Sequence, residues 1–182
     1  MGLIWIIGAA LWGVAEATLF FIVPDVLITY AAVRWGWRAG LKLSLVAALA
    51  AAAGGAVLWW WGAYDAEAAR AAMLGVPAIG PDLIEKARAG MASVYWPLDL
   101  MLGALSGTPY KLYAVEAGAR GIDVFLFVAL SIPARLVRFV VTAAIASGGN
   151  ALFERMGIAR YSVPALALAW TAVYAVYWTL RS

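Results

Sequence analysis

Two long apolar stretches of this chain, residues 3–33 and 94–119, are each interrupted near the centre by proline and charged residues. A helix that crosses the hydrocarbon core of a bilayer needs about 20 residues. Residues 3–33 are too many for one straight span and too few for two. Because proline removes a helical hydrogen bond and clashes with the preceding turn, we expect a break near residues 22–23, with a second half-helix beginning at Pro24. One long, kinked spanning helix is the alternative.

The composition makes lipid the solvent for most of this chain. Of its 182 residues, 66% are hydrophobic and only 13% are Asp, Glu, Lys or Arg. A soluble domain of this size has too little interior to bury so much apolar surface. The sequence therefore predicts an all-α integral membrane protein that forms a single domain over residues 1–182.

The chain contains no cysteine and no histidine, and its net charge is +3. Disulfides, thiol chemistry and histidine-dependent catalysis are therefore excluded, as are the commonest transition-metal ligands. No run of basic residues points to a nucleic acid. We expect neither a cofactor nor a metal, and no enzymatic activity.

The other segments suggest an order of loops and spans. Arg34, Arg38 and Lys42 lie together without an acid, which places residues 34–42 on the cytoplasmic side. We expect residues 64–92 to form two short amphipathic helices in an interfacial linker. Spans are expected at residues 43–63, 122–147 and 163–180, with a polar turn at 148–162. The small-residue face of residues 47–55 permits a homo-oligomer.

These segments divide the chain into two halves of similar plan. In each half an interrupted, acid-bearing stretch precedes a full span, a pattern that places a binding site where the halves meet. The prediction is two re-entrant hairpins in an inverted-repeat arrangement with about three spanning helices. Its parts are a hairpin and span at 1–63, a linker at 64–92, a second hairpin and span at 93–147, and a turn and last span at 148–182.

The second interruption resembles the start of a helix. Thr108 is suited to cap a helix and Pro109 to its first position, with Gly118 or Gly121 at the end. The first N–H groups of such a helix are free and its dipole is positive there, so the site attracts anions. Lys111 adds a positive charge beside it.

Arg135 and Arg138 are spaced to share one helix face. Each costs about 2.5–3.5 kcal/mol at the centre of a spanning helix, so each needs a partner. The pair belongs either to a buried ion-pair network or to a site for an anionic headgroup, since guanidinium groups suit phosphate. Both descriptions can hold together. The candidate acidic partners are Glu16, Asp25, Asp99 and Glu116.

Glu16 and Asp25 lie on either side of the first break. Apolar surroundings favour the protonated form of a carboxyl group, so these acids are candidates for proton coupling. Alternatively, they satisfy backbone groups that the break exposes.

Two segments, Glu16 to Val33 and Gly107 to Ile145, together resemble the DedA family, specifically the YqaA-like branch of the VTT (SNARE-associated Golgi) superfamily. EATLFFIVPDVLITYAAV, Glu16 to Val33, is similar to the pattern Glu-x-x-Phe-Phe-Pro-x-Pro-Pro-Asp-Val-Leu, with Pro24 standing for the proline cluster. The segment from Gly107 to Ile145 is similar to Gly-x-Pro-Tyr-Lys, then Ala-Gly, then Ser-x-x-x-Arg-x-x-Arg-Phe.

The resemblance implies two oppositely oriented re-entrant hairpins that meet at mid-membrane. Members of this family are implicated in moving phospholipids or undecaprenyl phosphate between leaflets of the bacterial inner membrane, in some cases with protons. By position, Glu16 and Asp25 match the membrane acids of the family. The expected substrate-binding residues are Thr108, Pro109, Tyr110, Lys111, Arg135 and Arg138.

The expected function is therefore that of a flippase or scramblase for a phosphate-headed lipid, with that lipid as the partner. A small secondary transporter of an ion or solute would use the same broken helices. A structural protein of the envelope without transport is a further alternative. An intramembrane lipid-phosphate enzyme is disfavoured because neither histidine nor an aspartate-rich Mg²⁺ motif is present.

Overall fold

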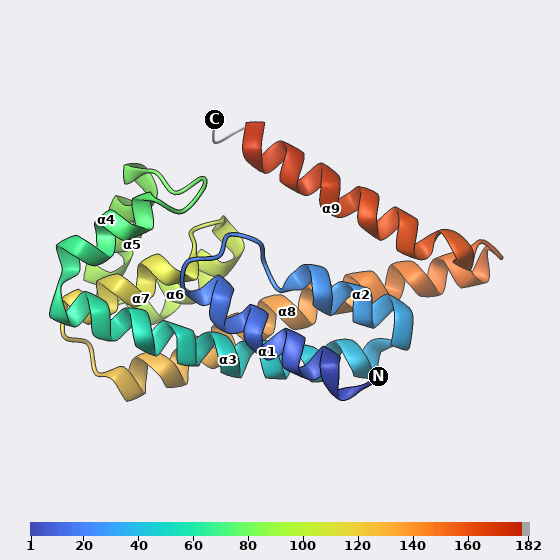
Figure 1. Cartoon of the computed structure of the whole chain (residues 1–182), viewed down its shortest axis with the longest axis horizontal. Helices are drawn as coiled ribbons and strands as arrows, with labels where there is room; N and C mark the ends of the chain where they lie inside the picture. The colour runs from blue at the N-terminus through green and yellow to red at the C-terminus, as the bar shows by residue number, and fades with distance from the viewer. Residues whose placement is uncertain (180–182) are drawn as a thin grey trace.

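The computed structural model describes residues 1–179, apart from the side chains of residues 104–106. This part of the chain is helical and contains no strand (Figure 1), so the all-α prediction is confirmed. In chain order the elements are α1 (Leu3–Ala17), α2 (Asp25–Trp35), α3 (Trp37–Tyr64), α4 (Ala66–Leu74), α5 (Pro81–Ala92), α6 (Trp96–Ser106), α7 (Tyr110–Ala119), α8 (Val124–Arg155), the 3₁₀ turn η1 (Ala159–Tyr161) and α9 (Ser162–Thr179).

The long helices α3 and α8 form the scaffold. Both are long and apolar enough to cross a membrane. Near the start of α3, Gly40 packs against Ala143 late in α8. Further along α3, Gly55 packs against Tyr110, whose ring stacks on Phe127 early in α8. The two helices therefore run antiparallel along the long axis of the molecule (Figure 1).

Both scaffold helices are longer than the sequence predicted. Residues 34–42, expected as a connection, are helical except at Gly36. A single residue reverses the chain there because glycine adopts the positive φ of 84° without strain. The polar turn predicted at 148–162 is largely the last part of α8. Arg155 lies in the final turn of that helix, where a positive charge stabilises the helix dipole.

Helices α1 and α2 form a hairpin. The Trp5 ring at the start of α1 lies 5.5 Å from the Tyr30 ring and 4.8 Å from the Trp35 ring, near the end of α2. The chain thus turns back at residues 18–24, and the alternative of one long kinked helix is wrong. Helix α2 begins next to Pro24, as predicted.

Helix α1 ends at Ala17, earlier than the break predicted at residues 22–23. Around the tip that follows, side chains of the same hairpin donate hydrogen bonds to backbone carbonyl groups. The Thr18 hydroxyl donates to the carbonyl groups of the preceding turn, and the Trp12 indole donates to the Ile22 carbonyl at 2.9 Å. These bonds replace the helical hydrogen bonds that the break removes. Helix α1 therefore ends at Ala17, several residues before Pro24.

The second hairpin, α6–α7, approaches the first from the other end of α3. Gly103 of α6 packs against the Tyr113 ring of α7, and the chain turns at residues 107–109, so the second predicted interruption is confirmed. Gly118 packs against Trp59 near the end of α3. The Lys111 ammonium group donates to the Phe20 carbonyl at 2.6 Å, so the two hairpin tips meet beside the middle of α3.

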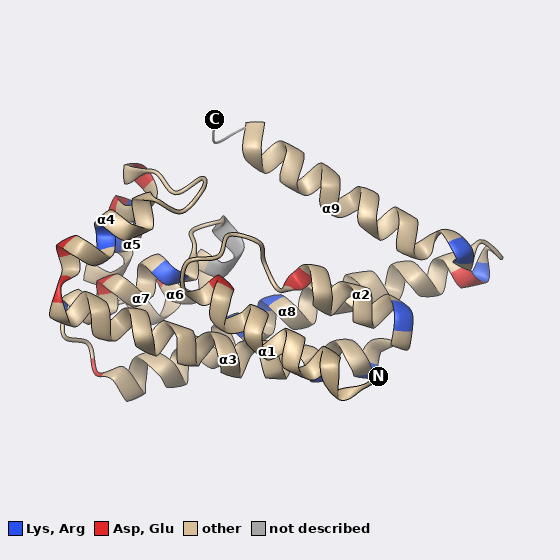
Figure 2. Ribbon diagram, in the orientation of Figure 1, with Lys and Arg blue, Asp and Glu red and all other residues tan. Residues whose placement is uncertain are grey.

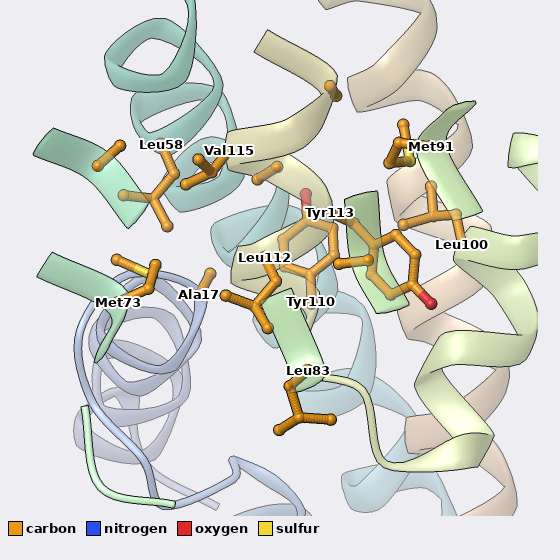
Figure 3. Packing of buried hydrophobic residues seen from close by; sticks show 14 of the residues in the cluster. Ala17, Leu58, Met73, Leu83, Met91, Leu100, Tyr110, Leu112, Tyr113 and Val115 are labelled. Carbon is orange, nitrogen blue, oxygen red and sulfur yellow. The ribbon is translucent and has the colours of Figure 1, made fainter. Parts of the chain in front are cut away.

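Helices α4 and α5 are the two short linker helices that the sequence predicted. They pack on the second hairpin through a hydrophobic cluster (Figure 3). Met73 of α4 and Leu83 and Met91 of α5 gather with Leu112 and Tyr113 of α7 in this cluster. The α4–α5 loop thereby lies over the hairpin tips.

Helix α9 stands partly apart from the bundle (Figure 1). It is anchored by three contacts to the first hairpin. The Trp170 indole donates to the Thr29 hydroxyl at 2.9 Å, the Tyr174 hydroxyl accepts the Val23 N–H at 3.0 Å, and Trp178 lies edge-on to Phe21. Its other faces are largely exposed. Thus α9 forms one wall around the tip of α1–α2.

Candidate functional site

A cavity of about 370 Å³ lies where the two hairpin tips meet. Residues of α8 and α9 and the α4–α5 loop complete its walls. Few charged residues are buried, and apart from Glu116 they lie where α1, α2, α7 and α8 approach one another (Figure 2). The charged residues that line the cavity are Glu16, Asp25, Lys111 and Arg138.

Arg135 and Arg138 of α8 each pair with one carboxylate of the first hairpin. Arg135 pairs with Glu16, and both side chains are almost fully buried. Arg138 pairs with Asp25 at 2.7 Å, and the Thr142 hydroxyl donates to the same carboxylate at 3.0 Å. Because Arg138 is 22% exposed and lines the cavity, it can meet a ligand. Arg135 lies deeper and holds α1 against α8.

Aromatic rings enclose the deeper arginine. The Arg135 guanidinium lies 4.9 Å from the centre of the Tyr110 ring and 5.0 Å from that of Phe139, distances at which a cation is attracted to a ring face. Tyr110, predicted to bind substrate, does not line the cavity. Instead it links Arg135, Phe127 and the glycine face of α3.

The turn before α7 differs from the predicted helix start. Helix α7 begins at Tyr110, with Pro109 at the cap position and no cap bond from a side chain. The prediction that Thr108 caps this helix is therefore wrong, because Pro109 has an extended backbone (ψ 131°) and shifts the start by one residue. Thr108, Pro109 and Lys111 all line the cavity.

Glu116 and Asp99 do not join the arginines of α8. Glu116 is buried and accepts two hydrogen bonds from Arg70 of α4, at 2.7 and 2.9 Å. The bond to Glu116 raises the pKa of Arg70 above its usual range, so this pair ties the linker to α7. Asp99 lies in the first turn of α6 and packs beside Gly90 of α5.

Several lining residues were not predicted as site residues from the sequence. Trp170, Tyr174 and Tyr177 of α9 face the cavity, as do Thr142 of α8 and Phe21 at the first tip. The spacing of the α9 aromatics places them on one helix face. The same pattern is typical of an interfacial aromatic belt, so the sequence alone did not separate the two roles.

Comparisons with protein-family models, with curated proteins and with solved structures find no match to this chain.

Proposed function

We propose that this chain is a lipid carrier of the bacterial inner membrane and moves a phosphate-headed lipid between leaflets. Undecaprenyl phosphate and phospholipids are the proposed cargo. The observation that carries this proposal is the cavity between the hairpin tips, which combines Arg138, Lys111 and the starts of two helices. These are the groups that bind phosphate in proteins.

The proposal places α3, α8 and α9 across the bilayer and the two hairpins as re-entrant elements from opposite faces. The basic residues of 34–42 put the ends of α1–α2 in the cytoplasm. The tips then lie at mid-membrane. Non-helical backbone is tolerated at that depth only when protein or water surrounds it, and the hydrogen bond from Lys111 to the Phe20 carbonyl joins the two tips.

The walls of the cavity suit the two parts of a lipid. Charged groups gather on the side of α8 and the hairpin tips, whereas Phe21, Trp170 and Val173 supply apolar surface. In this account the phosphate group enters the polar side and the hydrocarbon chain passes along α9 into the bilayer. The sparse packing of α9 against the bundle supports this path.

Glu16 and Asp25 are the proposed proton acceptors. Each neutralises one arginine in the observed arrangement. Protonation of either carboxylate would end its attraction to the arginine and release the guanidinium to the phosphate group. Lipid movement would thereby be coupled to proton uptake. The resemblance to the DedA family, carried by the same residues, agrees with this mechanism.

Transport in proteoliposomes tests the proposal. We expect the protein to accelerate the movement of a headgroup-labelled polyprenyl phosphate between leaflets. Arg138→Ala should slow that movement about tenfold or more, because it removes a charge-assisted hydrogen bond to the phosphate. Arg38→Ala, which removes an exposed arginine far from the cavity, is the matched control and should transport normally.

The same vesicle assay distinguishes a lipid carrier from a transporter of solutes. The proposal fails if no labelled lipid moves although the reconstituted protein keeps its melting temperature. Movement of free phosphate or another small anion without lipid movement would instead support a secondary transporter of solutes.

A further inference from the structure

The charges around the cavity do not balance. When Arg135 is included, which does not line the cavity but pairs with Glu16 behind its wall, two carboxylates meet three cations, which leaves 3 − 2 = +1. Each arginine has its own carboxylate, so the excess charge belongs to Lys111. The hydrogen bond of its ammonium group among the described residues goes to the neutral carbonyl of Phe20. The five charged side chains are Glu16, Asp25, Lys111, Arg135 and Arg138.

The position of Lys111 is costly in the absence of a ligand. The residue is only 2% exposed, and a buried charge is normally paired. It lies in the first turn of α7, where the positive end of the helix dipole repels a cation and attracts an anion. An anion beside Lys111 would remove both penalties.

Thr108 gives an independent indication of a ligand at the same turn. The residue is 3% exposed and lines the cavity. Its hydroxyl makes no hydrogen bond of regular geometry among the described residues, and the Tyr113 hydroxyl is its polar neighbour. The N–H groups of Tyr110 and Lys111 at the start of α7 also lack helical acceptors, whereas that of Leu112 donates to the Pro109 carbonyl at 3.1 Å. The turn therefore presents an ammonium, a hydroxyl and backbone donors to the cavity.

We propose that Thr108 and Lys111 form the seat where the phosphate group first binds, while both arginines keep their carboxylates. This inference rests on the function proposed above and adds a binding order and a charge preference. A headgroup with one net negative charge cancels the excess charge of the cluster. A zwitterionic headgroup leaves it uncancelled, so the seat selects anionic phosphate esters over phosphocholine lipids.

Thermal stability of the purified full chain in a neutral detergent tests the seat. The probes are inorganic phosphate, dihexanoyl phosphatidic acid and dihexanoyl phosphatidylcholine. We expect phosphatidic acid to raise the melting temperature of the unmodified chain and phosphatidylcholine to leave it unchanged. Stabilisation by inorganic phosphate at the same concentrations would show that the seat recognises the free anion as well as the lipid headgroup.

Variants of the seat should lose this response. Lys111→Met should raise the Kd for phosphatidic acid about tenfold or more, and Thr108→Val about threefold to tenfold. Without ligand, Lys111→Met should melt at the same or a higher temperature, because it removes an unpaired buried charge. Lys42→Met, which removes an exposed lysine, should bind as the unmodified chain does.

Two results would overturn the inference. The first is a Lys111→Met variant with unchanged affinity for phosphatidic acid. The second is equal stabilisation of the unmodified chain by the anionic and zwitterionic lipids. If Lys111→Met binds normally while Arg138→Met does not, the phosphate group sits on the arginine and the proposed carrier function survives. If the unmodified chain neither binds nor transports any phosphate lipid, both proposals fail.

Discussion

Arg135→Met is expected to lower the free energy of unfolding by about 3–5 kcal/mol, because it leaves the Glu16 carboxylate buried without a partner. The two side chains are almost fully buried, and their bond joins α1 to α8. Methionine keeps much of the volume of arginine. The decrease in the free energy of unfolding therefore reports the missing charge rather than a new cavity. This free energy is measured by unfolding the protein in mixed micelles with increasing sodium dodecyl sulfate.

A double variant distinguishes the energy of the ion pair from the cost of leaving one buried charge unpaired. Removing both charges, with Arg135→Met and Glu16→Gln together, should recover a large part of the loss, because no unpaired charge remains. Arg88→Met is the matched control. Its ion pair with Glu85 is 3.8 Å long and exposed on both sides, so we expect a change within about 1 kcal/mol. Equal small losses for Arg135→Met and Arg88→Met would contradict the structural role of the buried pair.

Gly118→Ala is expected to be similarly damaging for a different reason. A Cβ atom at Gly118 would overlap the backbone carbonyl of Trp59 and lie 2.8 Å from the backbone nitrogen of Ala63. Backbone atoms of α3 cannot rotate away from the added Cβ as a flexible side chain could. Helices α7 and α3 would therefore have to move apart. We expect a loss of about 3 kcal/mol or more in the free energy of unfolding.

Gly148→Ala is the control for this substitution. Gly148 is likewise helical, inside the long helix α8, but an added Cβ there meets nothing within 4 Å. Because alanine is the better helix former, this change should be neutral or stabilising by up to about 1 kcal/mol. If Gly118→Ala folds as stably as Gly148→Ala, the close approach of α7 to α3 is not present in the protein.

The positions of the helix breaks could be predicted because their causes are local. Pro24 and Pro109 each lack a backbone donor and disfavour helix at the residue before them, although Pro133 is accommodated inside α8. The glycines and prolines of residues 75–81 likewise marked the turn between α4 and α5. The early end of α1 at Ala17 depends on bonds from Thr18 and Trp12. The Trp12 bond depends on the turn of the hairpin, so no local sequence pattern predicts it.

Ion-pair partners were harder to predict than the charged residues themselves. The need of Arg135 and Arg138 for acidic partners followed from their place in an apolar helix. The choice of Glu16 and Asp25 over Glu116 depends on which hairpin faces which side of α8, a long-range property of the fold. Glu116 instead meets Arg70, which lies in the segment 64–92 that the sequence predicts as an interfacial linker.

The direction in which the two hairpins enter the membrane is the central claim, because the cavity at mid-membrane depends on it. The chain has no cysteine, so single-cysteine variants carry one thiol each. Gly2→Cys and Trp37→Cys flank the first hairpin, and Ala92→Cys and Ala119→Cys flank the second; all four positions are exposed.

The measurement is labelling of these thiols with a membrane-impermeant maleimide in right-side-out and inside-out vesicles. The account predicts that positions 2 and 37 react from the cytoplasmic side and that positions 92 and 119 react from the opposite side. If positions 2 and 37, or positions 92 and 119, react from opposite sides, the corresponding stretch spans the membrane, and the two-hairpin account is wrong.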